Sequence, residues 1–380
     1  MIYLDNSATS YPKPDCVIDS IKEIMLKYGA NSGRGSYKMA IDTTEQIYLS
    51  RKKIADFFNM SDPEKVIFTY NCTTALNMAI KGIAKKGSHF IISDFEHNAV
   101  VRPLEALKQN GISDYSVARV ENDLYKTLRN FENCINKNTV AIICTGASNV
   151  FGIIPPYKAL ASLAHKHKLL FILDYSQIAG IIPLDLRNKN IDIVCCSGHK
   201  GLMGLSGVGL LLLNNDIILN TIIEGGTGSN SESLLQPEEY PDRLESGTPN
   251  IVGIIALSRS IDFINKVKSE NIYNHEINLL RYLQYNLENN RKIRLYSDLC
   301  DNRKRYAPIL SFNVENMHSE EVVDRLSQDN IAVRAGLHCA PSAHKRMNTL
   351  STGTIRISPS VFTEKNHIDF LIKSLRKFAK

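Results

Sequence analysis

The segment IDIVCCSGHKGLMGLSGVGLLLLN, residues 191–214, contains two apolar runs, IDIVCCSG and GVGLLLLN, and each is typical of a buried strand. Only the glycine-rich GHKGLMGLS joins them, and this connection is too short for the crossover helix that parallel neighbours need. Four earlier apolar runs alternate with segments of helical period: VIFTY (66–70), HFIISD (89–94), TVAIICTG (139–146) and LLFILD (169–174). The alternation predicts an α/β fold whose large domain has a mostly parallel seven-stranded sheet flanked by helices, with one antiparallel strand.

The length of the chain, 380 residues, exceeds the size at which a single hydrophobic core keeps growing. We expect a large domain at residues 15–257 and a smaller α+β domain formed by 1–14 and 258–380. The stretch 225–250, rich in Gly, Pro, Ser and acidic residues, predicts a long irregular loop of the kind that is usually functional. The expected helices span 15–28, 40–58, 74–84, 156–167, 251–267, 273–287 and 319–328, and the small domain adds strands at 311–314 and 331–336.

The composition excludes several classes of protein. The net charge of +6 comes from 45 basic and 39 acidic residues spread along the chain, which argues against a nucleic-acid partner. The longest apolar runs are too short to cross a membrane, and the first residues lack the pattern of a secretory signal, so we expect a cytoplasmic protein. The eight cysteines form no CxxC pair, and we expect reduced thiols that are mostly buried.

Polar residues follow four of the predicted strands. A lysine is usually a solvated charge, but Lys200 follows a buried strand between glycines, where a desolvated amine can form a Schiff base with a carbonyl compound. Asp174 ends another apolar run and could hold a pyridine nitrogen protonated, or simply cap the next helix. His97 could stack on a cofactor ring or move protons, or be a structural histidine. Thr73, at a predicted helix start, could bind phosphate or act as a helix cap.

The order of these motifs is more specific than any one of them. TTALN, EHN, ASNVFG, DYSQIAG, SGHKGL, SGTPN and RAGLHCAPSAHK follow one another between YLDNSATSYPKP near the start and GTIRIS near the end. In this order the chain resembles the class V aminotransferase group of fold-type I pyridoxal phosphate enzymes. Within that group it is most similar to the cysteine desulfurases and the related selenocysteine lyases, and the resemblance covers almost the whole chain.

The resemblance implies that pyridoxal phosphate is bound at the sheet edge. Lys200 would hold it as a Schiff base, Asp174 would contact its pyridine nitrogen, Gln177 its phenolic oxygen, and His97 would stack on its ring. The residues implied to bind the phosphate are Thr73, Thr74, Ser197 and His199. Asn149 would lie beside the cofactor and the substrate. Gly247 and Thr248 would reach the phosphate site of the neighbouring subunit. The resemblance therefore also implies a homodimer with shared active sites.

Cys339 decides which reaction the resemblance implies. By composition alone it would be a buried small residue, but Arg334, His338 and Lys345 form a basic neighbourhood that could favour a thiolate. It occupies the position of the sulfur-accepting cysteine of the desulfurases. These enzymes convert L-cysteine to L-alanine and keep the sulfur as a persulfide, with Lys200 and His97 as the expected proton carriers and a sulfur-acceptor protein as the expected partner.

Three arginines are expected to bind substrate. Arg356 of GTIRIS matches the arginine that grips the substrate carboxylate bidentately, although a surface ion pair is the simpler interpretation. Arg34 and Arg334 are further candidates. Gly33 and Leu337 depart from the pattern, since some close desulfurases have a histidine at the first position and a histidine is often seen at the second. These changes leave the implied cofactor site intact and concern proton transfer and partner recognition.

Other functions stay open on the sequence alone. A selenocysteine lyase would use nearly the same residues to release selenide and L-alanine, and a class V transaminase would need no Cys339. His338, Cys339 and His344 have poor spacing for a structural zinc site, and we expect no metal. No GxGxxG follows an early strand, which argues against a dinucleotide enzyme. A pure sulfur carrier would not explain Lys200 with Asp174.

Overall fold

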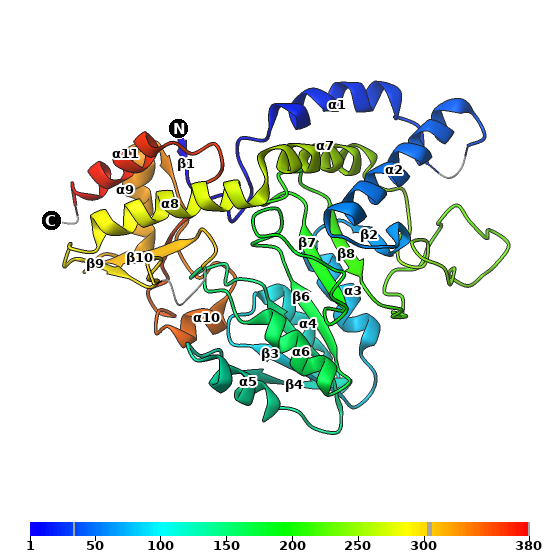
Figure 1. The fold of residues 1–380 in the computed structure, drawn as a ribbon, viewed down its shortest axis with the longest axis horizontal. Helices are drawn as coiled ribbons and strands as arrows, with labels where there is room; N and C mark the ends of the chain where they lie inside the picture. Colours follow the sequence, from blue (N-terminus) through cyan, green and yellow to red (C-terminus); the bar gives the residue numbers. More distant parts are fainter. Residues whose placement is uncertain (33–34, 302–305, 379–380) are drawn as a thin grey trace.

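The structure is a computed structural model that describes residues 1–32, 35–301 and 306–378. A seven-stranded sheet forms its centre (Figure 1), with the strand order β2-β8-β7-β6-β5-β3-β4. The strands are β2 (Val66–Thr69), β3 (Ser88–Ser93), β4 (Ser113–Ala118), β5 (Thr139–Thr145), β6 (Leu170–Asp174), β7 (Ile193–Ser197) and β8 (Gly209–Leu213). β8 runs antiparallel to both of its neighbours, and the other adjacent pairs are parallel. The predicted fold class is confirmed.

Each strand of this sheet except β4 corresponds to one of the apolar runs identified in the sequence. Its sequence, SDYSVA, is polar, and it lies at the edge of the sheet beside β3 alone. An edge strand has one partner and an exposed face, so it needs no continuous apolar run to form.

Helices cover both faces of the sheet. On one face, α3 (Cys72–Ile83) and α4 (Asn98–Gln109) share a core with inward side chains such as Phe90 and Ile92. On the other face, Ile91 belongs to a core that includes residues of α2, α6 and α7. This alternation along β3 is the two-residue period of a strand that is buried on both sides. The bounds of the other large-domain helices are α1 (Asp15–Lys27), α2 (Lys38–Phe57), α5 (Leu124–Glu132), α6 (Tyr157–Lys166) and α7 (Ile251–Val267), with a single 3₁₀ turn at Pro63–Lys65.

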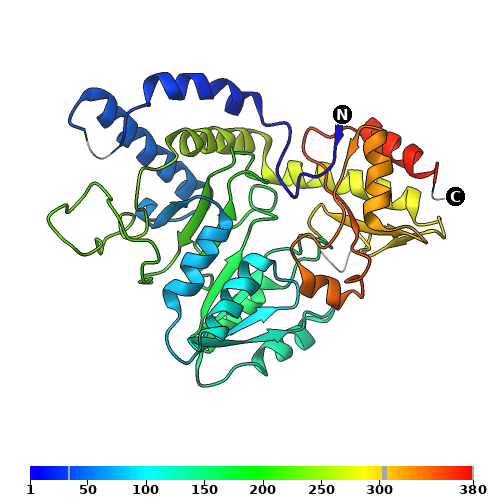
Figure 2. The same ribbon diagram turned by 180° about the vertical axis from the view of Figure 1, so that it is seen from behind.

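A second core lies in the C-terminal part of the chain (Figure 2). The elements in this part of the chain are α8 (Ser269–Leu287), β9 (Ile293–Leu295), β10 (Leu310–Val314), α9 (Ser319–Gln328), β11 (Ile331–Ala332), α10 (Pro341–Arg346), β12 (Ile355–Ile357) and α11 (Lys365–Leu375). Leu4 joins this core, and β1 (Ile2–Tyr3) pairs in parallel with β11, which confirms that the first residues return to the C-terminal unit. The domain boundaries at 14 and 257 stay a prediction.

The strand expected at residues 331–336 is shorter than the sequence indicated. β11 ends at Ala332, and the chain then turns through Gly336 at a φ of 97°. Arg334 makes only an isolated bridge to Arg356. The backbone leaves the extended conformation here because this segment builds the turn that carries Cys339.

Candidate active site at the carboxyl edge of the sheet

The predicted site residues gather where the central strands end. Asp174 and Ser197 are the last residues of the neighbouring strands β6 and β7, and His97 precedes α4, the helix after β3. Parallel strands bring their carboxyl ends to one edge of a sheet, which is where open α/β sheets bind ligands. The sheet therefore assembles residues that lie far apart in the chain.

Two backbone segments approach each other closely beside Lys200. Gly180 has a φ of 80°, and a Cβ atom at this position would lie 2.3 Å from the carbonyl oxygen of Gly201. A Cβ atom at Gly201 would likewise lie 2.4 Å from the oxygen of Ala179. Only glycine fits at these contacts. The pairing of DYSQIAG with SGHKG in the sequence thus has a physical reason, because the two turns pack backbone against backbone and fix the start of the Lys200 side chain.

The surroundings of Lys200 favour a neutral amine. Burial lowers the pKa of its ammonium group, and the positive charges of Arg356 and Arg334 lower it further, while the carboxylate of Asp174 raises it. A neutral amine is the reactive form in carbonyl chemistry. The local electrostatics therefore match the role expected for Lys200.

Asp174 is held in one orientation within the protein. Only 5% of its surface is exposed, and its Oδ1 accepts a hydrogen bond of 3.0 Å from the backbone N–H of Ser176. The thiol of Cys72 lies 3.7 Å from the same oxygen. Asp174 therefore orders the turn after β6, and no α-helix begins there for it to cap.

His97 has the structural role that was weighed from the sequence, because its side chain caps α4. Its Nδ1 accepts a hydrogen bond of 3.0 Å from the N–H of Ala99 and so caps α4. Burial, with the charges of Lys200 and Arg334, lowers its pKa to about 4 against the opposing effect of Asp174. The ring is therefore neutral at pH 7 with its proton on Nε2, and this N–H is a fixed donor at the sheet edge.

The start of α3 is capped by a residue that the sequence reasoning missed. The N-cap is Asn71 and not Thr73 or Thr74. Its Oδ1 accepts a hydrogen bond of 2.9 Å from the backbone N–H of Thr74. Thr73 stays exposed, and the hydroxyl of Thr74 donates to Asn71 at 3.2 Å. A strand followed directly by Asn and a helical run was the available signal. The threonines therefore lie at a positive helix end, where they can meet an anion.

Ser197, His199 and Gln177 line the adjoining turns. Ser197 is 4% exposed, and the carbonyl of His199 accepts from the N–H of Ser10 and from Nζ of Lys13, both at 3.0 Å. Burial lowers the pKa of His199 to about 4, and burial lowers that of Lys13 to about 8. Gln177 donates weakly to the carbonyl of Ser7, at 3.4 Å.

The turn that carries Cys339 is attached to the same edge through its backbone. His338 and Cys339 have φ values of 48° and 57°, and the carbonyl of Cys339 accepts from the N–H of Asn98 at 2.8 Å. The side chain of Asn149 donates to the carbonyl of His338 at 2.6 Å. Two successive left-handed residues without glycine are a strained arrangement of the kind found at functional turns. They bring Cys339 next to His97 in space.

Two expectations about this turn are corrected. Cys339 is exposed, as are Cys16 and Cys300, and Cys134 is half-buried. The buried cysteines are Cys72, Cys144, Cys195 and Cys196. Half of the eight cysteines are therefore buried, fewer than expected. His338 adds no positive charge beside Cys339, because burial and the charge of Arg356 lower its pKa to about 2. Its Nε2 lies 3.1 Å from the carbonyl of Thr354.

Arg356 is deeply buried and already bonded, so it is no surface ion pair. Only 1% of Arg356 is exposed. Its Nη1 donates a hydrogen bond of 2.9 Å to the carbonyl of Asn149, and its Nη2 donates one of 2.6 Å to Oδ1 of Asp5. Its Nε has no partner in the described structure. Arg334 is exposed, and its carbonyl accepts from the backbone N–H of Arg356. Arg34 and Gly33 lie outside the described residues.

These residues fit an aldehyde cofactor that carries a phosphate group. Several buried polar atoms among them, including Nδ1 of His199 and Oδ1 of Asn149, have no partner within the described structure. Unpaired buried polar atoms are costly unless a ligand or water satisfies them. Together with the amine of Lys200, whose pKa is lowered by burial, the carboxylate of Asp174 and the start of α3, they match the chemical groups of pyridoxal phosphate.

Comparison with known proteins agrees with this geometry. The family model described as aminotransferase class-V matches residues 2–371. The chain belongs to the aminotransferase class-V family. Membership in this family implies pyridoxal phosphate as the cofactor.

The relatives of this class V chain include proteins named as cysteine desulfurases. The chain is 31% identical to a probable cysteine desulfurase of Pyrococcus abyssi, over 100% of the chain and 94% of that protein. It is 30% identical to one of Methanothermobacter thermautotrophicus, with the same coverage. The apo structure of a cysteine desulfurase from Thermococcus onnurineus NA1 has a TM-score of 0.91 and 28% identity, covering 100% of this chain and 94% of that one.

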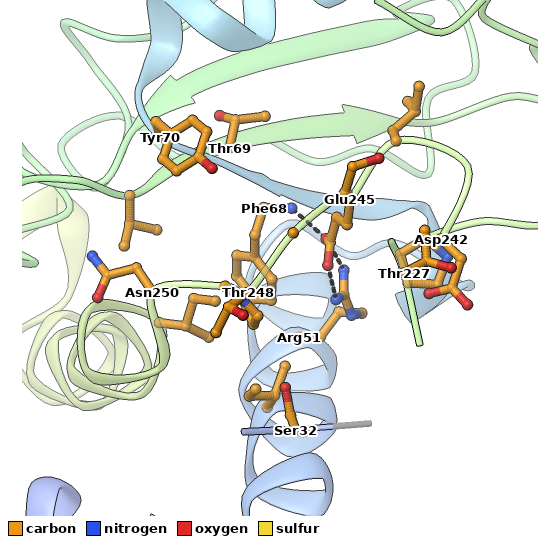
Figure 3. Close-up of a pocket in the computed structure, with 18 of the residues that line it drawn as sticks. Ser32, Arg51, Phe68, Thr69, Tyr70, Thr227, Asp242, Glu245, Thr248 and Asn250 are labelled. Carbon is orange, nitrogen blue, oxygen red and sulfur yellow. Dashed lines mark hydrogen bonds and ion pairs between the residues drawn. The ribbon is translucent and has the colours of Figure 1, made fainter. Parts of the chain in front are cut away.

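Next to the carboxyl edge of the sheet of this class V protein lies a pocket of about 260 Å³. Gly247 and Thr248 line it together with Thr74 of the same chain, and Figure 3 shows Thr248 and Asn250 on one side of it. The predicted loop at 225–250 supplies much of its wall and contains no helix or strand.

Two absences concern the described residues alone. No helix among them is both long and apolar enough to span a membrane. Nor does this part of the chain hold a group of three or more His, Cys, Asp or Glu side chains suited to a metal ion.

Proposed function

We propose that the chain is a pyridoxal phosphate-dependent cysteine desulfurase that converts L-cysteine to L-alanine and holds the sulfur on Cys339 as a persulfide. The observation that carries the proposal is the combination of Lys200, whose amine is electrostatically favoured in its neutral form, with the exposed Cys339 on a turn bonded to the start of α4. The names of the full-length relatives support the same reaction.

The residues that would hold the cofactor are those at the sheet edge. Lys200 would bind its aldehyde carbon, Asp174 its pyridine nitrogen, Gln177 its phenolic oxygen, and the ring of His97 would cover one face. Its phosphate would meet Thr73, Thr74, Ser197 and His199, and Gly247 and Thr248 would complete the site of a second subunit. When bound, pyridoxal phosphate draws electrons from the α-carbon of an amino acid and so labilises the α-proton and the β-substituent.

The side chains of the protein would then carry out the remaining steps. Arg356 would hold the substrate carboxylate, the amine of Lys200 would take up the α-proton, and the thiolate of Cys339 would attack the sulfur of the substrate. A sulfur–sulfur bond forms as the carbon–sulfur bond breaks; the β-carbon gains a proton and the α-carbon regains one, with Lys200 and His97 as the proton carriers. Cys339 and L-cysteine thus become a Cys339 persulfide and L-alanine, with no other reactant consumed.

The exposure of Cys339 supports transfer of sulfur to an acceptor protein, because a persulfide on a surface turn can be reached by another thiol.

Exposed apolar side chains support a homodimer. Leu234 and Leu235 are 102% and 81% exposed in the loop that carries Thr248. Apolar side chains in such a position favour contact with another protein surface.

Two variants test the proposal. The purified protein should show the Schiff-base absorption band of pyridoxal phosphate, and Lys200→Ala should lose it. Cys339→Ser should keep the band but lose alanine release from L-cysteine. A colourless wild type that cannot be loaded with pyridoxal phosphate would overturn the proposal. Unchanged alanine release by Cys339→Ser would also overturn it, in favour of a transaminase-type reaction.

A comparison of two substrates tests the alternative activity. Turnover on L-selenocysteine with almost none on L-cysteine under reductant would make the chain a selenocysteine lyase.

A further inference from the structure

The outer strand of the large sheet is covered by side chains in place of a neighbouring strand. β2 is the first strand in the sheet order and pairs with β8 alone. On its other side, the N–H of Phe68 donates to Oε1 of Glu245 at 2.6 Å, and the carbonyl of Val66 accepts from Nη1 of Arg51. One carboxylate and one guanidinium therefore satisfy the polar backbone groups that an edge strand leaves free.

The same two side chains form a bidentate ion pair. Nη1 and Nη2 of Arg51 lie 2.7 and 2.8 Å from Oε1 and Oε2 of Glu245, and Figure 3 shows these contacts beside Phe68. The side chains of Arg51 and Glu245 are only 6% and 17% exposed, and the guanidinium lies 4.6 Å above the centre of the Phe68 ring. Planar, buried pairing of this kind holds both partners in one geometry.

Glu245 belongs to the long loop and precedes Gly247 and Thr248 by only two and three residues. Gly247 has a φ of 87°, so the loop turns sharply just after the ion pair. Arg51, Glu245 and Thr248 line one pocket with Thr74 at the start of α3. The ion pair therefore fixes the loop to the rigid sheet immediately before the residues proposed to bind phosphate.

We infer that Arg51 and Glu245 are positioning residues, which hold Gly247 and Thr248 in the conformation that binds the phosphate group of the cofactor in the neighbouring subunit. The inference rests on the proposed function for the identity of the ligand. It predicts that the pair matters for ligands with a phosphate group and not for ligands without one.

The experiment compares pyridoxal phosphate with pyridoxal, which lacks the phosphate, by titration of the full-length apoprotein. Glu245→Gln and Arg51→Gln should raise the Kd for pyridoxal phosphate roughly 10- to 100-fold, since each removes charge-assisted bonds, and leave the Kd for pyridoxal within about twofold. Arg51→Lys keeps the charge but not the bidentate fork, and its Kd should fall between those of wild type and Arg51→Gln.

Lys53→Gln and Asp262→Asn are matched controls. These residues form an exposed ion pair, with Nζ and Oδ2 2.6 Å apart, between the same helix α2 and α7, and the charge changes are identical. Their Kd values should equal those of wild type. A charge swap, Arg51→Glu with Glu245→Arg, should not restore affinity, because the carbonyl of Val66 would then face a carboxylate.

Equal losses for both ligands, or no loss for either in Glu245→Gln, would overturn the inference. Hydrogen exchange supplies a readout that is independent of the cofactor. The amide of Phe68 and those of residues 246–248 and 250 should exchange faster in Arg51→Lys and Glu245→Gln than in wild type, and unchanged exchange counts against the positioning role. If wild type binds neither ligand, the proposed function fails, while the exchange data still decide whether the pair holds the loop.

Discussion

At the scale of single residues, the guanidinium of Arg356, proposed to hold the substrate carboxylate, is a buried charge that already has protein partners. It is buried with one carboxylate partner, Asp5, which lies 351 positions away in the sequence, and with the carbonyl of Asn149. Burial lowers the pKa of Arg356 and Asp5 raises it. A substrate carboxylate that takes the place of one of these oxygens would keep the buried guanidinium paired, which matters because an unpaired buried charge is costly.

Arg356→Lys should therefore weaken substrate binding. We expect the KM for L-cysteine to rise about tenfold or more, because an ammonium group cannot reproduce the fork, while the Schiff-base absorption stays unchanged. Asp5→Asn is the informative partner variant: it removes the competing carboxylate and should lower the KM. A rise in KM for Asp5→Asn equal to that of Arg356→Lys would mean that Asp5 supports the arginine and does not compete with substrate.

Glu96, which the sequence reasoning passed over, is a buried carboxyl group near the site with a raised pKa. It is fully buried, and its Oε1 accepts from the hydroxyl of Ser93 at 2.5 Å and from the N–H of Thr145 at 2.7 Å. Burial raises its pKa from 4.5 to about 8, although those hydrogen bonds oppose the shift. At pH 7 it is therefore neutral beside a neutral His97.

This shift predicts a dependence of stability on pH. Between pH 4.5 and 8 the unfolded chain loses the proton of Glu96 while the folded chain keeps it. The contribution of this group to the free energy of unfolding is therefore fully present below pH 4.5 and is lost as the pH rises towards 8. The limiting slope is about 1.4 kcal/mol per pH unit. Glu96→Gln, which mimics the neutral acid, should gain stability relative to wild type between pH 5 and pH 8, as measured by urea unfolding. The exposed Glu238→Gln is the control, and a constant difference for Glu96→Gln across pH would contradict the assignment.

At the scale of elements, the short helix α10 holds the cysteine turn from its far end. Nε of Arg346, its last residue, lies 3.1 Å from Oδ2 of Asp94, and Nη2 lies 3.3 Å from Oε2 of Glu121. Asp94 follows β3 and Glu121 follows β4, so α10 is tied to the loops beside the site. The other end of the turn is fixed by the bond between Cys339 and Asn98.

Removing the anchor on α10 should affect sulfur transfer but not the cofactor. Arg346→Met should slow persulfide formation on Cys339 by roughly tenfold, because a partly buried ion pair contributes about 1–2 kcal/mol to holding the turn. Mass spectrometry after trapping of the persulfide with iodoacetamide measures the rate. Arg325→Met breaks an exposed pair on α9 and should react like wild type. Equal rates for the two variants would refute the anchoring role.

At the scale of the whole molecule, the loop at 225–250 presents apolar side chains to solvent. Leu234 and Leu235 are almost wholly exposed, and α2 adds exposed residues such as Tyr48 and Leu49. Tyr48 lines the same pocket as Thr248. This surface is the expected contact of the proposed homodimer.

A double substitution tests that contact. Leu234→Asp with Leu235→Asp should shift the protein toward monomers in analytical ultracentrifugation and weaken binding of pyridoxal phosphate, since charges are costly in an apolar interface. Tyr125→Asp alters a side chain on α5 that is 81% exposed and should leave the mass unchanged. A monomeric wild type, or an unaltered dimer in the double variant, would disprove this interface.

The sequence by itself determined the features that depend on local pattern. The alternation of apolar runs predicted the sheet, the short link between β7 and β8 predicted the antiparallel strand, and residues at strand ends were expected at one edge. These predictions worked because strand burial and connection length are local properties. Only tertiary structure decided the pairs Arg356 with Asp5 and Arg51 with Glu245, the neutral state of His338 and the exposure of Cys339. Each depends on which distant groups share a desolvated space, and no spacing along the chain encodes that.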